Sequence, residues 1–491
     1  MRRGIAALLL AALAPEFSPG DTFTYIDPQG RTQTVEGVLA GSGQGMHALE
    51  QSDGRMLVIP QGALRERTVS MPPEPIAARD MAARLVEQFG EENIRTLVEG
   101  QYVVGLVLAG PLPPRSETRV TGFLKQAGRF LKNVENVLTR FCHDLRIDPE
   151  PARYPLVTLI FESDRDFDAY AAEATGGLGL SAERILGFYS PLTNWLALRI
   201  GECRTFQVPL HEAVHQQVFN RGLIQRLSGV PVWFNEGIAT GFENDGERIN
   251  VGPNKVNATY ANRLGSTNRL NWEAIVKDDT AFQGDVLAGE AYAHAWSLHW
   301  LLVTEHRSNY VRYLRCLGQI APLEEPTADE RSRLFQETFG MSIREMEDGF
   351  PRLLQAALRK QRIRTEETPA AGRSITYGDA SAVELTAIQR AGGSGLTEVR
   401  GKLCNISPFR DFAYHVTVQT SGGLYAEWFL PSVGSQKSAE LNEQYVTKHI
   451  PGGPGTDAQT YWVEVQSALP DSDVVTDWKT KGLPVPEWKP R

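Results

Sequence analysis

The stretch VPLHEAVHQQVFNRGLIQRLSGVPVWFNEGIATGFE, which runs from Val208 to Glu243, decides how the rest of the chain is interpreted. It contains His211 and His215, four positions apart, and Glu236 further along. Residues four apart on an α-helix lie about 40° apart around its axis, so the two imidazoles are expected to point the same way. Imidazole and carboxylate groups suit Zn²⁺, and a catalytic zinc takes three protein ligands. The pattern therefore predicts one Zn²⁺ held by His211, His215 and Glu236.

Glu212 supplies the base that hydrolysis at such a site requires. It follows the first histidine directly, where it can take a proton from an attacking water and return it to a leaving amine. Glycine, serine and proline residues between 222 and 231 are expected to end the first helix and reverse the chain. A second helix, Val232 to Phe242, would then carry Glu236 back toward the first. The alternative is a buried structural pair of histidines, because the pattern His-Glu-x-x-His also arises by chance.

The sequence Trp233-Phe234-Asn235-Glu236-Gly237-Ile238-Ala239-Thr240 resembles the WxNEGxA(T/S) signature of gluzincin peptidases. This resemblance implies that Glu236 is the third zinc ligand and that Thr240 contacts His211 and orients it without binding the metal. The region 76–364 resembles the peptidase-MA-like gluzincins, specifically an uncharacterised planctomycete group with HExxHQ and WxxEG elements. It implies a zincin-like catalytic domain.

Two further parts of the chain are candidates for contact with substrate. In gluzincins an edge strand just before the zinc helix pairs with the substrate backbone, and the resemblance assigns this role to Trp195, Leu196, Ala197, Leu198 and Arg199. A plain core strand is the alternative. A donor to the developing oxyanion is needed, and gluzincins use a tyrosine or histidine some sixty residues after the zinc-binding glutamate. The resemblance therefore assigns this role to the predicted helix 288–304, with Tyr292 first and His294 second. Core packing is the alternative for both.

The resemblance implies a zinc metallopeptidase. The Gly-x-Met-Glu-Asn motif of gluzincin aminopeptidases has no counterpart upstream of the zinc helix, so an endopeptidase is favoured over an aminopeptidase. A catalytically inactive envelope binding or scaffold protein is the alternative from another class. Hydrolysis of a non-peptide amide also stays open, because activation of water by zinc does not depend on the acyl group.

Composition limits the partners. The chain has 50 Lys and Arg against 59 Asp and Glu, a formal net charge of −9, which argues against nucleic acid. No apolar run reaches the roughly 18–20 residues of a membrane span. A basic start followed by a short apolar run within residues 1–20 resembles a secretory signal and favours export, with a cytoplasmic protein as the alternative. The β-rich ends could contact the cell envelope. The four widely spaced cysteines are predicted to be free thiols.

The length of 491 residues predicts several domains, and the fold class expected is multidomain α+β. Five short strand patterns after residue 21 resemble a small Src-homology-type barrel. The strand patterns near the C-terminus loosely resemble an FxLYD-type β-sandwich. The expected division is a possible signal segment (1–20), a small β-barrel (21–70), a zincin-like gluzincin domain (76–364), a β-sandwich (382–470) and an extended tail (471–491).

Overall fold

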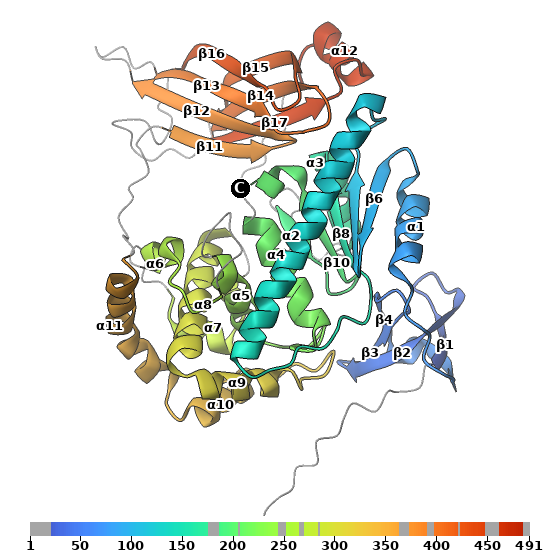
Figure 1. Ribbon diagram of the computed structural model, residues 1–491, viewed down its shortest axis with the longest axis vertical. Coiled ribbons are helices and arrows are strands. Elements are labelled where there is room, and N and C mark those ends of the chain that lie inside the picture. Colours follow the sequence, from blue (N-terminus) through green and yellow to red (C-terminus); the bar gives the residue numbers. More distant parts are fainter. Residues whose placement is uncertain are drawn as a thin grey trace, which may run out of the picture.

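The computed structural model describes residues 21–174, 186–204, 207–243, 252–264, 270–282, 285–362, 373–389, 397–420, 423–446 and 461–484. The possible signal segment lies outside them. The chain folds as a multidomain α+β protein with a central region between N-terminal and C-terminal β-structure, as the sequence predicts (Figure 1).

A five-stranded mixed sheet forms one half of the central region. Its order is β6 (Ile94–Glu99), β7 (Tyr102–Val107), β8 (Leu156–Phe161), β10 (Trp195–Arg199) and β9 (Gly187–Tyr189). The strands β7, β8 and β10 are parallel to one another, whereas β6 and β9 run antiparallel at the two edges. Every residue of β7, β8 and β10 is buried, as expected for strands that are covered on both faces.

Helices cover both faces of this sheet. On one face α1 (Ala78–Phe89) and α3 (Asp164–Ala174) pack Leu85 and Phe167 against Val157 and Leu159. On the other face lie α2 (Glu117–Asp144) and α4 (Gln207–Asn220), whose apolar residues join the main core. The long amphipathic helix α2 crosses the front of the molecule in Figure 1 and contacts both the sheet and α4. Thus one side of α4 packs against α2 and the sheet, and its opposite side packs against α5.

The other half of the central region is helical. The helix α5 (Val232–Phe242) packs against both α4 and α8 (Asp285–Glu305), and a cluster of aromatic side chains surrounds it. The remaining helices are α6 (Ala258–Leu264), α7 (Trp272–Lys277), α9 (Arg307–Leu317), α10 (Ala328–Phe339) and α11 (Ile343–Gln361). Capping boxes at Thr327 and Ser342 begin α10 and α11. These helices fix α5, and with it Glu236.

The N-terminal β-structure is a five-stranded antiparallel sheet around Phe23, Leu49 and Ile59. Its hydrogen-bonded order, β4-β3-β2-β1-β5, agrees with the five expected strands. Their bounds are β1 (Asp21–Ile26), β2 (Thr32–Gly43), β3 (Met46–Glu50), β4 (Met56–Pro60) and β5 (Leu64–Val69). The buried side chain of Arg226 donates to Gly54 O at 2.6 Å, and this contact fixes the sheet to the central region.

The C-terminal β-structure consists of two sheets with the orders β11-β12-β13-β16 and β15-β14-β17. Val399 and Val416, one from each sheet, lie in the same core. The strands are β11 (Arg373–Gly378), β12 (Ser381–Gln389), β13 (Thr397–Asn405), β14 (Phe412–Thr420), β15 (Gly423–Val433), β16 (Ser438–Val446) and β17 (Tyr461–Ala468). The first strand begins before the predicted boundary at residue 382.

The expectation of an extended tail over 471–491 is wrong for its first part. A helix, α12 (Asp473–Lys481), follows the last strand. Val475 and Trp478 bury themselves against Ala413 and Phe429 of the sandwich. The prolines after residue 483 suggested an extended chain, but they lie beyond this helix and do not interrupt it.

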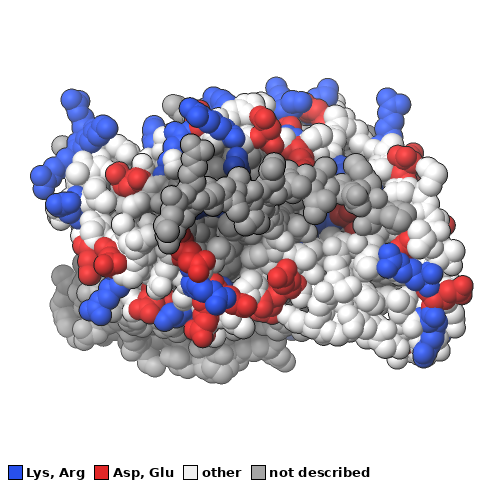
Figure 2. All heavy atoms as spheres, turned by 90° about the horizontal axis from the view of Figure 1, so that it is seen from below, with Lys and Arg blue, Asp and Glu red and all other residues white. Residues whose placement is uncertain are grey.

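The four cysteines are free, as predicted. None of the helices in the described ranges combines the length and the apolar run that crossing a bilayer requires. On the face shown in Figure 2, basic and acidic side chains are interspersed, and no broad basic surface of the kind that binds nucleic acid is in view.

Candidate metal centre

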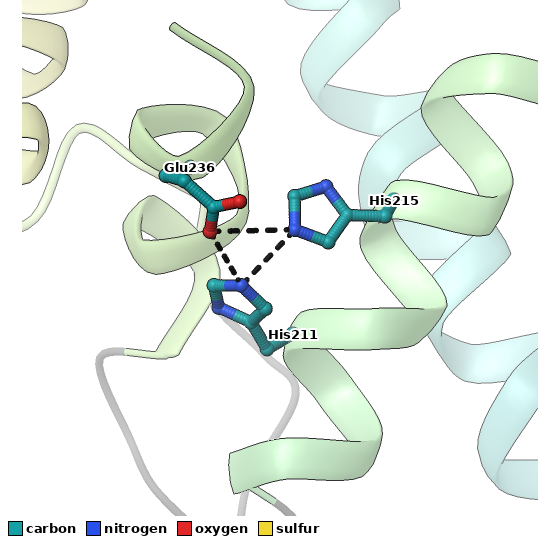
Figure 3. Close-up of side chains that lie close together, drawn as sticks. All are labelled: His211, His215 and Glu236. Carbon is teal, nitrogen blue, oxygen red and sulfur yellow. Dashed lines mark hydrogen bonds and ion pairs between the residues drawn. The ribbon is translucent and has the colours of Figure 1, made fainter. Parts of the chain in front are cut away.

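The two histidines and the glutamate come together as the sequence predicts. Ala213, Val214 and Val218 of α4 are buried in the core. His211 and His215 therefore face away from that core, toward α5, and Glu236 on α5 points back at them (Figure 3). Only 12%, 7% and 14% of the side-chain surfaces of His211, His215 and Glu236 are exposed, so the cluster is largely shielded from water.

The spacing of the three side chains fits a small cation. His211 Nε2 lies 2.9 Å from Glu236 Oε2 and 3.0 Å from His215 Nε2, and the third side of the triangle, His215 Nε2 to Glu236 Oε2, is 3.5 Å. Ligands placed tetrahedrally about 2.0 Å from a zinc ion are about 3.3 Å apart. The triangle therefore has the size of three corners of such a site.

The outer nitrogen of each histidine is held by an oxygen. His211 Nδ1 lies 2.6 Å from Glu243 Oε1, and His215 Nδ1 lies 3.1 Å from Asn235 Oδ1. A carboxylate only accepts, so Nδ1 of His211 donates, and the Asn235 carbonyl favours the same arrangement at His215. Each Nε2 is then the nitrogen available to a metal, with its ring orientation fixed from behind. Histidine ligands in metal sites are supported in this way.

The electrostatics of the cluster favour positive charge at its centre. Burial alone would lower the pKa of His211, but hydrogen bonds to Glu236 and Glu243 outweigh burial and raise this pKa well above its usual value. Burial would raise the pKa of Glu236, but His215 and His211 hold it well below its usual range. The field that favours a proton on His211 equally favours a divalent cation at the same place.

Glu212 sits between the cluster and the sheet. Its Oε2 accepts a hydrogen bond from the backbone N–H of Tyr189 at 2.8 Å, which fixes the carboxylate against β9. Burial raises the pKa of Glu212, whereas the charges of His211 and His215 act in the opposite direction. A carboxylate with a raised pKa beside a cation site has the proton affinity that a general base requires.

Tyr292 reaches the cluster and His294 does not. The ring of Tyr292 lies 6.0 Å from that of His211, measured between centroids. The charge of Glu236, together with burial and the charge of Glu212, raises the pKa of Tyr292, so its hydroxyl stays protonated and can donate. Two residues later on α8, His294 points elsewhere, and its Nε2 is 3.9 Å from Glu290 of the preceding turn. Helical geometry separates the two side chains by about 200°.

The predicted role of Thr240 is wrong. Its hydroxyl donates to Glu236 O at 2.8 Å, one turn back on its own helix, and does not support His211. A short β-branched side chain in a helix readily makes this bond. Glu243 supports His211 instead, and Tyr260 in turn donates to Glu243 Oε2 at 2.9 Å. Glu243 follows Glu236 by seven residues, or two helical turns, and this spacing is the signal that could have identified it.

The prediction that Trp195 to Arg199 form an edge strand is also wrong. They form β10, which pairs with β8 on one side and with β9 on the other. Its backbone is therefore already hydrogen-bonded, and the alternative of a core strand is correct. In the described part of the chain β9 is the edge strand on this side of the sheet. The continuous apolar run Trp195-Leu196-Ala197-Leu198 is typical of a strand buried on both faces.

Comparison with known proteins finds a matching family, but the function of that family is not known. The sequence model of a family described as "Protein of unknown function (DUF1570)" matches residues 207–324, which contain α4, α5 and Tyr292. No curated protein matches the chain. One similar solved structure is a DUF1425 family member from Shewanella sp. pv-4, at 13% identity over 21% of this chain and 93% of that chain, with a TM-score of 0.11. The matched family model thus covers the whole His211, His215 and Glu236 cluster.

Proposed function

We propose that this chain is a zinc-dependent metallopeptidase of the gluzincin type that cleaves peptide bonds as an endopeptidase. The observation that carries the proposal is the triangle of His211 Nε2, His215 Nε2 and Glu236 Oε2, with sides of 2.9, 3.0 and 3.5 Å. These residues would hold the cation. When bound, a zinc ion lowers the pKa of water and polarises a carbonyl oxygen.

The chain's own groups supply the proton transfers. Glu212 would accept a proton from the attacking water and deliver it to the nitrogen of the leaving amine. The bond from Tyr189 N–H holds its carboxylate in place while it does so. Tyr292, kept protonated by the Glu236 charge, would donate to the oxygen that becomes negative as the carbonyl is attacked.

The edge strand β9 offers a place for an extended peptide. Ser190 N donates to Trp195 O at 2.9 Å, and Leu186 O accepts from Arg199 N at 3.3 Å. Backbone groups alternate in direction along a strand, so those of Gly187 and Tyr189 point away from β10. The N–H of Tyr189 already donates to Glu212, so a substrate strand could pair with the carbonyl of Tyr189 and with the backbone groups of Gly187. Tyr189 also binds Glu212, so a peptide on this edge would lie beside the base.

The proposal is tested by metal analysis and a peptide-library digest on the same purified protein. We expect about one zinc per chain and cleavage within peptides, abolished by a chelator and restored by Zn²⁺. Glu212→Gln should keep the metal and lower turnover by about 10²–10⁴-fold. Cleavage by this variant at the rate of the unaltered protein would contradict the role of Glu212. A metal-loaded protein that cleaves no peptide would instead support an inactive binding or scaffold protein.

The predicted secretory signal lies outside the described residues, and export from the cytoplasm stays part of this proposal.

A further inference from the structure

A cavity lies between the central region and the C-terminal sandwich. Its lining includes none of the His211, His215 or Glu236 side chains. Its volume is about 700 Å³, within the range of about 300–1,000 Å³ typical of small-molecule sites. The walls come from α2, β8, β10, the short helix η4 (Ile200–Arg204) and the loop after β13. Most of its lining is apolar and includes Phe123, Phe130, Ile160, Leu198 and Ile406.

The lining of this interdomain cavity has several polar side chains, and three of them, one buried and two exposed, could hold a ligand. At the buried end is Thr158, which is 1% exposed and whose Oγ1 has no hydrogen-bond partner. A buried hydroxyl without a partner is uncommon, and a ligand oxygen could satisfy it. At the solvent end are the exposed Arg119 and Arg204. Neither guanidinium forms an ion pair with a described residue, and no Asp or Glu is among the described lining residues.

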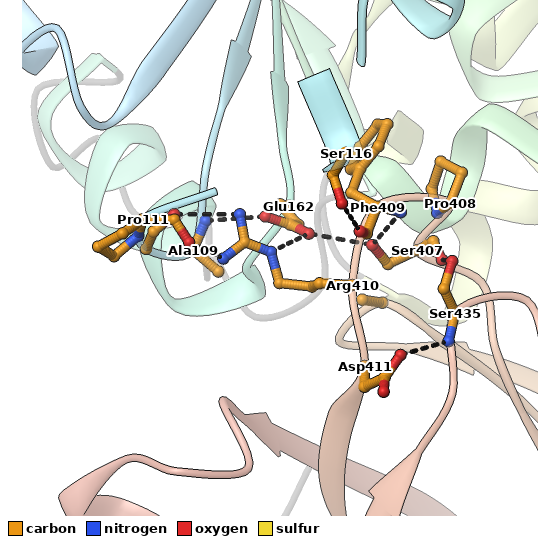
Figure 4. Close-up of polar contacts among 12 residues, drawn as sticks. Ala109, Pro111, Ser116, Glu162, Ser407, Pro408, Phe409, Arg410, Asp411 and Ser435 are labelled. Atoms are coloured by element: carbon orange, nitrogen blue, oxygen red, sulfur yellow. Dashed lines mark hydrogen bonds and ion pairs between the residues drawn. The ribbon is translucent and has the colours of Figure 1, made fainter. Parts of the chain in front are cut away.

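The loop that closes the cavity is fixed. Arg410 donates through Nε to Glu162 Oε1 at 3.0 Å and through its terminal nitrogens to Pro111 O and Gly110 O (Figure 4). Ser407 Oγ also donates to Glu162 Oε1, at 3.0 Å. Glu162 and Arg410 have side chains only 0% and 4% exposed, so the two domains are joined here by a buried ion pair. The cavity is therefore preformed rather than created by a moving domain.

We propose that this cavity binds an elongated hydrophobic carboxylate that carries one hydrogen-bonding oxygen at its apolar end. The carboxylate would lie between Arg119 and Arg204, because an anion there meets two cations in a chain of net charge −9. The apolar body would contact Phe123 and Phe130, and the terminal oxygen would accept from Thr158. This inference does not depend on the proposed peptidase activity.

Binding is tested on the full-length protein with cis-parinaric acid and its methyl ester, whose fluorescence rises in apolar surroundings. We expect saturable binding of the acid. Ala127→Trp, which fills the cavity from α2, should abolish binding. The matched control is Ala357→Trp, which fills a different cavity from α11 and should bind as the unaltered protein does. Absence of saturable binding, or equal binding by Ala127→Trp, would overturn the proposal.

The two ends are tested separately. Replacing Arg119 and Arg204 together by Gln should weaken binding of the acid about tenfold or more and leave the methyl ester unchanged. An ω-hydroxy fatty acid should displace parinaric acid at about three to ten times lower concentration than the unsubstituted acid of equal length. Thr158→Val should remove that preference. If Thr158→Val still prefers the ω-hydroxy acid over the unsubstituted acid, the placement of the ligand is contradicted. Equal losses of affinity for the acid and the methyl ester in the arginine variant would contradict it too.

Cysteine alkylation gives an independent measure of the ligand's position. Cys203 and Cys404 line the cavity, whereas Cys316, which is also half-buried, lies elsewhere, on α9. The ω-hydroxy acid should slow alkylation of Cys203 and Cys404 and leave that of Cys316 unchanged. Unchanged alkylation of all three at a saturating concentration would show that the acid binds outside the cavity.

Discussion

Glu243 Oε1 lies 2.6 Å from His211 Nδ1, although the two residues are separated by 32 positions and by the whole of α5. This contact fixes which nitrogen of His211 faces Glu236. It makes Glu243 a part of the candidate metal centre, although Glu243 is not one of the three residues that could hold the ion. Such outer partners orient a ligand and increase its basicity.

The first prediction concerns this contact. Glu243→Gln should weaken zinc binding by about 10–100-fold, because it replaces a charge-assisted acceptor with a neutral amide. Thr240→Val, on α5 just before Glu243, is the matched control and should leave zinc affinity unchanged, because the Thr240 hydroxyl bonds only to its own helix. Competition with a fluorescent chelator measures both affinities. Equal losses in the two variants would show that Glu243 has no special role.

The second prediction separates the two candidates for oxyanion stabilisation. Tyr292→Phe should lower kcat by about 10²–10³-fold with little change in zinc content, since it removes one donor to the developing charge. His294→Gln should cleave at the original rate, because its ring lies beside Glu290 and not at the cluster. Steady-state kinetics on a peptide found in the library digest provides the measurement. The reverse pattern would make His294 the donor.

The third prediction concerns stability with and without metal. A ligand that binds only the folded state stabilises it, by about 4 kcal/mol at a free concentration a thousand times Kd. Chelation should therefore lower Tm, and Zn²⁺ should restore it. In His215→Ala the chelator should leave Tm unchanged. A chelator effect of the same size in this variant would place the metal elsewhere.

The fourth prediction concerns the ion pair between the domains. Arg410→Met leaves Glu162 buried without its partner and should cost about 3–5 kcal/mol of unfolding free energy. Burial already raises the pKa of Glu162 despite Arg410, so losing this cation leaves the carboxylate with less compensation. Lys277→Met breaks an exposed pair with Glu273, which water and salt screen, and should leave the unfolding free energy nearly unchanged. Urea denaturation compares the two. Similar small losses would mean that the Glu162 pair contributes little.

The fifth prediction concerns pH. Burial and the nearby charge of Asp164 raise the pKa of Asp379 to about 7, from an ordinary value of 3.8. Between these values the folded state binds more protons than the unfolded state, so this group makes the protein less stable as pH rises from about 4 to 7, with no further change above. Asp379→Asn should make stability depend less on pH in this range. Because an amide has only one acceptor oxygen, the variant also loses the hydrogen bond donated by either Ser467 N or Asp164 N. An unaltered slope in thermal unfolding across pH would contradict this assignment.

The clustering of His211, His215 and Glu236 could be predicted from the sequence because it depends on local geometry. Spacing along α4 orients His211 and His215, and a short connection returns Glu236 to them. The five short strand patterns after residue 21 likewise correspond to the five strands of the N-terminal sheet. The coarse division into β-structure at both ends and a mixed central region follows from the same patterns.

The failures concern contacts between distant segments. Whether β10 is an edge or a central strand depends on where β9 lies. The apolar run in residues 195–199 indicates burial of both faces but does not identify the neighbouring strands. Support of His211 by Glu243 requires the angle between α4 and α5, which packing against α8 sets. Burial of Trp478 in α12 depends on an apolar surface around Ala413 and Phe429 that only the folded sandwich provides.

The central claim is that one divalent cation is bound between α4 and α5. The most direct measurement is anomalous X-ray diffraction from crystals of the protein purified with zinc, recorded on both sides of the zinc absorption edge. The account predicts a single strong peak about 2.0–2.1 Å from His211 Nε2, His215 Nε2 and a Glu236 oxygen. A peak at another place, or no peak at this cluster in crystals grown with excess zinc, would contradict it.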